Sequence, residues 1–187
     1  MNIGEINIPK SPFLDTTTNR PSREWLLYLL GLGRSVQYGS FYDTTTQSTT
    51  ANTPKPITYN TTDLSNGVYV DGFSSRIKFS QGGVYNFQFS VQVSNTDASL
   101  DDLTIWVRKN GVNVANSAGV ASIPAKHAGT NGHAILAWNY YISVQYTDYI
   151  ELIWMPGLTT TTLPTIAATA TVPQIPSIIL TVNQVNF

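Results

Sequence analysis

The stretch "GGVYNFQFSVQV" at residues 82–93 decides the fold class of this chain. Every second residue from position 85 onward is large and apolar: Tyr85, Phe87, Phe89, Val91 and Val93. The positions between them are polar and uncharged: Asn86, Gln88, Ser90 and Gln92. Because successive side chains of a β-strand point to opposite faces, this alternation predicts a strand with one buried face and one face that tolerates water.

The same period-two pattern extends from residue 36 to the end of the chain. Asp71-Gly72 predicts a turn between two short strands, and Asn110-Gly111 is a strong signal for a two-residue hairpin turn. Further strands are expected within four stretches: 35–43, 133–146, 148–155 and 177–185. About eight to ten short strands with no helix between them predict an all-β fold, an antiparallel sandwich of jelly-roll type.

The first 35 residues lack this pattern and are expected to form an extended arm with one short helix at roughly 21–31. Pro21 suits the first helical turn, Ser22 a cap, and Gly31 and Gly33 the end of the helix. The apolar positions of one helical stripe are Trp25, Leu26, Leu29 and Leu30. A helix of this length is marginal in water, so it is expected to dock onto another surface. The sequence therefore predicts an anchoring arm at 1–35 and a jelly-roll domain at 36–187.

The composition narrows the classes of function. The 187 residues are 42% hydrophobic but only 11% charged, the formal net charge is −1, and there is no cysteine. This balance gives no support for binding to nucleic acid or to an anionic membrane surface, and it excludes disulfides and thiolate metal sites. No apolar run reaches the roughly 20 residues of a membrane span, and the first residues lack the pattern of a signal peptide. We therefore expect assembly in the cytoplasm of the producing cell.

Two predicted strands are apolar on both faces. In 134–144 and in 149–155, large apolar side chains alternate with further apolar ones, whereas a jelly-roll strand needs only one buried face. Association of subunits would cover the second face, and the alternative is that the arm folds over it or that the side chains tolerate exposure. The candidate interface residues are Ile135, Tyr141, Tyr149, Ile153 and Ile179.

Three landmarks resemble the jelly roll of the tumour-necrosis-factor-like family, which includes the heads of complement-type proteins. They are Gly83, Tyr85 and Phe87 in the first strand, Asn110 and Gly111 in the hairpin turn, and Asp148, Ile150 and Leu152 in a later strand, although Thr147 stands where the family has Gly. The resemblance implies a compact homotrimer around a threefold axis. It also implies that the last strand lies beside the first in the sheet that faces this axis.

The arm "SPFLDTTTNRPSREWLLYLLGLG" at 11–33 is similar to the N-terminal segments of many small bacteriophage virion proteins, and the closing stretch 172–185 is similar to the ends of phage jelly-roll proteins. This resemblance implies a decoration, cement or short head-fibre protein located on the virion. Its partners would be its own copies and a protein of the capsid or of the collar or tail. The residues expected to anchor it are Phe13, Leu14, Arg20, Pro21, Trp25, Leu26 and Leu29.

No catalytic motif is present in the sequence, so we expect no enzymatic activity, no cofactor and no metal. Three alternatives stay open. His127 and His133, or a group of Asp97, Asp101 and Asp102, could hold an ion. A head that recognises a host polysaccharide would use the loops 44–56, 122–133 and 157–174, or the aromatic residues Trp106, Tyr140, Tyr141 and Trp154. An enzyme that degrades such a polysaccharide is the third alternative.

Overall fold

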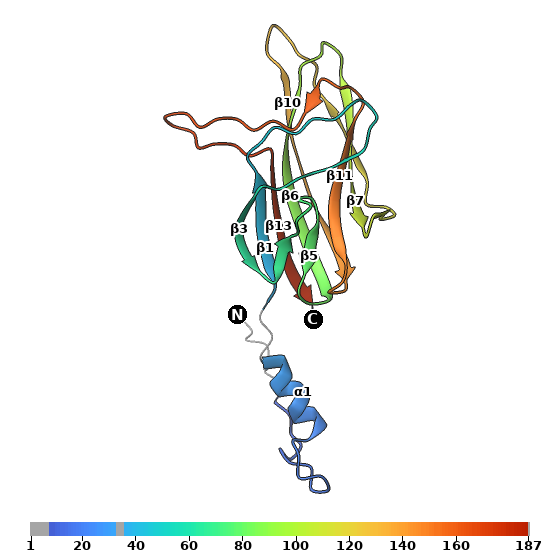
Figure 1. Ribbon diagram of the computed structural model, residues 1–187, viewed down its shortest axis with the longest axis vertical. Helices are drawn as coiled ribbons and strands as arrows, with labels where there is room; N and C mark the ends of the chain where they lie inside the picture. The colour runs from blue at the N-terminus through green and yellow to red at the C-terminus, as the bar shows by residue number, and fades with distance from the viewer. Residues whose placement is uncertain (1–7, 33–35, 187) are drawn as a thin grey trace. The chain divides into compact units, whose positions relative to one another are not determined.

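The computed structural model describes residues 8–32 and 36–186. The chain divides into two compact units, Met1–Ser35 and Val36–Phe187. Within the described residues, the first unit contains the single helix α1 (Arg23–Leu32) and the second contains thirteen strands (Figure 1). The all-β class with one short helix that the sequence predicts is confirmed.

The strands of the second unit form two sheets. The first sheet has the order β10 (Gly132–Val144), β6 (Gly83–Asn95), β13 (Ile178–Asn186), β1 (Tyr38–Asp43) and β3 (Thr61–Asn66), and β12 (Thr161–Thr162) also pairs with β6. The second sheet has the order β4 (Val68–Val70), β5 (Ile77–Phe79), β11 (Tyr149–Pro156), β7 (Asp101–Lys109) and β8 (Val112–Asn113). There, β2 (Lys55–Pro56) pairs with β11, and β9 (Gly119–Ile123) pairs with β7.

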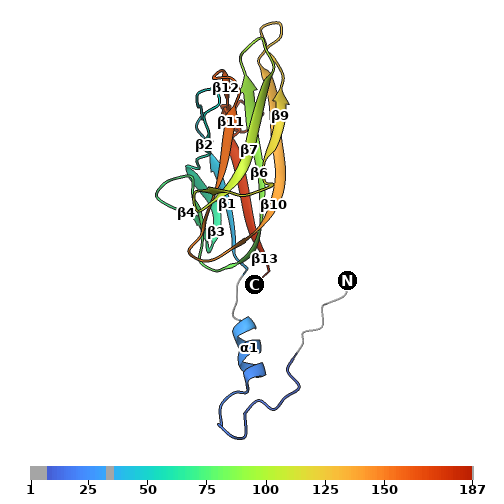
Figure 2. The same ribbon diagram turned by 90° about the vertical axis from the view of Figure 1, so that its right-hand side faces the viewer.

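The topology is a jelly-roll sandwich, as predicted. All strand pairings are antiparallel. From β1 through β5, β6, β7, β10 and β11 to β13, the chain alternates between the two sheets at every step. Figure 2 shows β11 and β7 of the second sheet in front of β6 and β10 of the first. The last strand β13 lies beside the first strand β1, from Tyr38↔Asn183 to Asp43↔Ile178. The strand arrangement that the family resemblance implies is therefore present.

The alternation at residues 85–93 has the predicted consequence. The five large side chains of β6 are at most 4% exposed, and they pack in one core with Leu103, Ile105 and Val107 of β7 and with Trp154 of β11. The polar side chains between them point away from this core. The hydrophobic contribution of such burial is about 1.5–3 kcal/mol per side chain.

The number of strands is larger than the predicted eight to ten. Five of the thirteen have only two or three residues, and β2 lies at the end of the stretch 44–56 that the sequence indicates as a loop. Strand β3 lies at the edge of its sheet and its side chains are mostly exposed. It therefore has no apolar alternation by which the sequence could reveal it.

The Asn110-Gly111 turn is confirmed. Both residues have positive φ, 51° and 79°, which a two-residue turn of this hairpin class requires. Asparagine and glycine adopt this left-handed conformation at low cost, so the two residues fix the register of β7 against β8 at Lys109↔Val112.

The helix starts later than predicted. The backbone N–H of Leu26 donates to the Ser22 carbonyl at 2.9 Å, so Ser22 occupies the cap position and helix α1 begins at Arg23. The expectation for Pro21 was wrong, because this residue precedes the cap and pairs with Leu14. Gly31 lies inside the helix, and Gly33 lies outside the described residues. The described helix is too short to cross a membrane.

Candidate functional site

One surface of the sandwich is the outer side of the first sheet, which we call the open face. Its residues alternate with the core residues along five strands, and the strand registers align them in rows such as Tyr141, Asn86, Asn183 and Tyr38. The members of the open face are Tyr38, Ser40, Tyr42, Leu64, Asn86, Gln88, Ser90, Gln92, Ile135, Ala137, Asn139, Tyr141, Ile179, Thr181 and Asn183.

The open face carries no charged side chain. Two titratable side chains border it. The Asp63 carboxylate of edge strand β3 lies 3.5 Å from the Ser40 hydroxyl, and His133 lies two residues before Ile135 on the same side of β10. The outer side of the second sheet differs, because Lys78, Asp102 and Arg108 alternate there with core residues. Depletion of charge together with exposed aromatic and aliphatic groups is the composition of the centre of a protein interface.

Three of the five predicted interface residues lie together on the open face. Ile135 and Tyr141 on β10 are 64% and 58% exposed, and Ile179 on β13 is 42% exposed. The other two lie on the second sheet. Ile153 is fully buried inside the chain and therefore presents no surface to a partner, and the half-buried Tyr149 lies under the Arg76 guanidinium at 4.4 Å.

Sequence reasoning missed two exposed apolar members of the open face: Tyr38 and Leu64. Each stands alone among polar neighbours in the sequence. Only the pairing of β1 with β3 and β13 places them on the same side as Ile135 and Tyr141. The signal is thus the register between strands, which alternation within one strand does not contain.

The arm folds into a second surface, a compact turn that we call the clip, residues 11–25. The Asp15 carboxylate accepts hydrogen bonds from the backbone N–H groups of Thr18 and Thr17, and these bonds lower the pKa of Asp15. Leu14 pairs with Pro21, and the Asp15 N–H donates to the Arg20 carbonyl at 2.8 Å. These bonds close a hairpin-like turn just before the helix.

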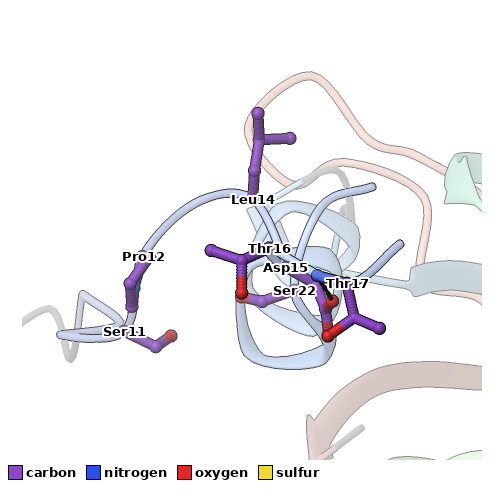
Figure 3. A pocket seen from close by; sticks show the side chains of 7 residues that line it. All are labelled: Ser11, Pro12, Leu14, Asp15, Thr16, Thr17 and Ser22. Carbon is purple, nitrogen blue, oxygen red and sulfur yellow. Dashed lines mark hydrogen bonds between the residues drawn. The ribbon is translucent and has the colours of Figure 1, made fainter. Parts of the chain in front are cut away.

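Five of the seven predicted anchor residues lie in the clip, and Leu26 and Leu29 follow it on helix α1. The Trp25 indole N–H donates to the Ser11 carbonyl at 2.8 Å, and the Trp25 ring meets Phe13 edge-on at 5.5 Å between ring centroids. A hollow of about 240 Å³ lies within the turn (Figure 3). The hydroxyls of Ser11 and Ser22 line this hollow, and both are buried without a hydrogen-bond partner among the described residues.

Helix α1 exposes four leucines on one side. Leu26, Leu27, Leu29 and Leu30 are 44–60% exposed, whereas Trp25 turns toward the clip. The sequence predicts that Trp25 shares one helical stripe with Leu26 and Leu29, but its ring packs against Phe13 instead. An apolar side of a helix is typical of a buried position, which here requires a covering surface.

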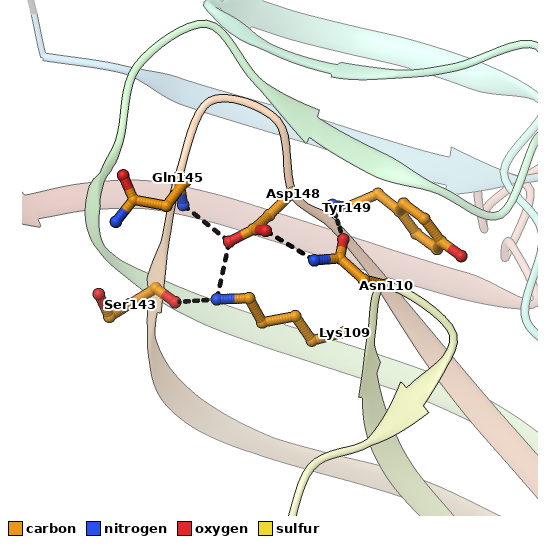
Figure 4. Close-up of polar contacts among 6 residues, drawn as sticks. All are labelled: Lys109, Asn110, Ser143, Gln145, Asp148 and Tyr149. Carbon is orange, nitrogen blue, oxygen red and sulfur yellow. Dashed lines mark hydrogen bonds and ion pairs between the residues drawn. The ribbon is translucent and has the colours of Figure 1, made fainter.

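A polar network joins two of the landmark segments (Figure 4). The Lys109 ammonium lies 2.7 Å from the Asp148 carboxylate and also donates to the Ser143 carbonyl at 2.9 Å. The Asn110 amide donates to Asp148 at 2.6 Å, and the Gln145 backbone N–H donates to it at 2.8 Å. Burial of Asp148 raises its pKa, but these hydrogen bonds and the Lys109 charge outweigh burial and hold the pKa below its usual value. The network ties the β7–β8 turn to the start of β11.

We expect Asp148→Asn to lower the free energy of unfolding by about 1–3 kcal/mol at pH 7, because a buried, charge-assisted acceptor is lost. Because the pKa of Asp148 is lower in the folded chain than in the unfolded chain, the carboxylate stabilises the fold at pH values above the ordinary Asp pKa, near 3.9. This contribution is lost as the pH falls through the pKa of the folded state. Urea unfolding should therefore show the variant's deficit at pH 7 and its disappearance in acid. The exposed Asp102→Asn is the control, and an equal deficit at both pH values would contradict the role assigned to the carboxylate.

The remaining predicted ligands do not assemble. Within residues 8–32 and 36–186, no group of three or more His, Cys, Asp or Glu side chains could hold a metal ion. Asp101 is buried and Asp102 exposed, on opposite faces of β7. The aromatic residues that could present rings to a sugar are also separated: Trp154 is in the core, Trp106 bonds Asn113 on the second sheet, and Tyr141 lies on the first.

The fold and these two surfaces define the class: an all-β jelly-roll sandwich with an uncharged outer sheet face and an N-terminal arm bearing an apolar helix. No family model matches this chain, and no curated protein matches it either.

Proposed function

We propose that this chain is a non-enzymatic structural protein of a bacteriophage virion, a homotrimer joined through its open face and attached to the particle by its arm. The observation that carries the proposal is the uncharged open face, which exposes Tyr38, Ile135, Tyr141 and Ile179 on one side of the sandwich. An isolated subunit would leave this surface in water, and association with identical copies removes it.

The polar members of the open face are compatible with such an interface. Gln88, Gln92 and Asn139 are neutral amides, and a neutral amide costs much less to bury than a charge when it finds a hydrogen-bond partner. Interfaces of this kind commonly contain bridging waters. A threefold arrangement is supported by the resemblance to the tumour-necrosis-factor-like family together with the pairing of the first and last strands.

The arm supplies the attachment. The exposed leucines of α1 would bury their side chains in a groove of another virion protein, in the capsid or the collar. The clip gives the arm a preformed shape, held by the Trp25–Ser11 bond and the Asp15 turn, so less conformational entropy is lost on binding.

Removing residues 1–35 tests the attachment. We expect the remaining chain, Val36–Phe187, to fold and to form the same oligomer, because it contains the entire core. In a co-sedimentation assay with virions that lack this protein, it should bind at least 100-fold more weakly than the full chain. Full-length Leu26→Glu/Leu29→Glu should fail in the same way. If the truncated chain still decorates particles, the arm is not the anchor, and binding to a panel of host glycans would favour a receptor-binding head instead.

A further inference from the structure

The long loop between β12 and β13 is a structured hairpin, which we call the finger, residues 163–177. In Figure 1 it projects sideways from the sandwich as the dark-orange excursion between these strands. Its base is fixed by two backbone hydrogen bonds of 2.9 Å between Gln47 and Leu163, and by the bond from the Ser177 N–H to the Asp43 carbonyl. Farther out, Ile166 and Ile175 exchange two more bonds of 2.9 Å.

Beyond its base, the finger is exposed over residues 166–174. A two-stranded hairpin without a packed face is marginally stable in water. Ile166 and Val172 are 42% and 49% exposed, and the segment from Leu163 to Ser177 contains no charged residue. Three alanines in it, at positions 167, 168 and 170, would allow another backbone to approach closely.

A hollow of about 300 Å³ lies where the finger leaves the sandwich. Its lining residues are Gln92, His133, Ala134, Ile135 and Ile166. Gln92 and Ile135 are members of the open face, so this hollow is continuous with the surface proposed to join the subunits. Its apolar part is formed by Ile135 and Ile166, and both are exposed.

We propose that the finger of one copy lies in the hollow at the base of the next copy's finger, so that the three fingers form a ring of clasps around the trimer. The inference rests on the proposed function, since it needs the trimer. Each copy carries both a finger and a hollow, and these are two different surfaces. A contact between the finger of one copy and the hollow of the next is therefore heterologous, and it closes into a ring when the copies are related by a threefold rotation. The finger carries no charge, and its tip turn Thr169–Val172 exposes small side chains. The hollow offers the apolar Ile135 and Ile166 beside the polar Gln92 and His133.

Cysteine cross-linking tests the clasp directly, because the natural chain contains no cysteine. The full-length chain carrying Val172→Cys and Ile135→Cys is treated with a short bis-maleimide and separated under denaturing conditions. We expect covalent dimers and trimers as the main products. The matched control combines Val172→Cys with Val112→Cys, whose side chain is 70% exposed on β8 of the other sheet. At least tenfold less intermolecular product is expected from the control.

The outcomes separate the clasp from the trimer itself. If both cysteine variants have the mass of three copies before treatment but give equal cross-linking, the clasp is wrong and the proposed trimer stands. A link within one chain, identified by mass spectrometry of the monomer band, also overturns the clasp. If the untreated chain has the mass of a single copy, the trimer fails and the clasp fails with it.

Discussion

Ile179→Arg is expected to convert the oligomer into folded monomers. Ile179 lies near the centre of the open face, on β13 between β6 and β1, and 42% of its side chain is exposed in the isolated chain. In a monomer, arginine at this exposed position should change the free energy of unfolding by no more than about 0.5 kcal/mol. In the trimer it would place an unpaired charge in each interface, which costs about 2–5 kcal/mol per contact. Dissociation should therefore shift by a factor of at least about 30 per contact.

The matched control for this prediction is Val112→Arg. Val112 is more exposed than Ile179 but lies on β8 of the second sheet, where arginine and lysine already occur. Light scattering after gel filtration should give the same mass for this control as for the natural chain, and one third of that mass for Ile179→Arg. Thermal unfolding of the Ile179→Arg monomer must still be cooperative. An oligomer that persists in Ile179→Arg would show that the open face is not the interface.

Trp154→Ala is expected to cause the largest loss of stability within the sandwich. Trp154 lies on β11 in the centre of the core and is fully buried. Removing a buried tryptophan side chain leaves a cavity and costs about 3–5 kcal/mol. This is a large part of the 5–15 kcal/mol that stabilises a typical domain. Urea unfolding should show the midpoint shifted to much lower denaturant with an unchanged slope.

The Trp154→Phe variant separates two contributions of the Trp154 side chain to stability: the volume that it fills and its indole N–H group. The indole N–H of Trp154 is buried and has no hydrogen-bond partner, so its loss removes an unfavourable group. The smaller ring leaves a smaller cavity than alanine does, and we expect a loss below about 2 kcal/mol. If phenylalanine destabilises the sandwich as much as alanine, the indole N–H contributes to stability and the packing explanation is incomplete.

The sequence predicts the sandwich well where one side chain in two is apolar and where turns need special backbone conformations. The alternation in β6 and the Asn110-Gly111 turn each depend on neighbours along the chain. These local patterns fix the fold class and the two short strands around Asp71-Gly72, which are β4 and β5.

The features that the sequence does not predict depend on contacts between residues far apart in the chain. Ile153 is fully buried within the chain, although it points to the opposite side of β11 from the core residues Leu152 and Trp154. Tyr38, Leu64 and Ile135 share a face only through the registers of four strand pairs. The Asp148 network likewise joins residues 38 positions apart. Such contacts follow from topology, which alternation alone does not specify.

The most direct test of the central claim is the molar mass of the purified full-length chain in dilute buffer, measured by sedimentation velocity over a range of concentrations. An uncharged sheet face hidden between identical subunits predicts one species of three chains that persists at low micromolar concentration. A single species with the mass of one chain across the whole range would contradict the claim, since the open face would then be stable in water without a partner.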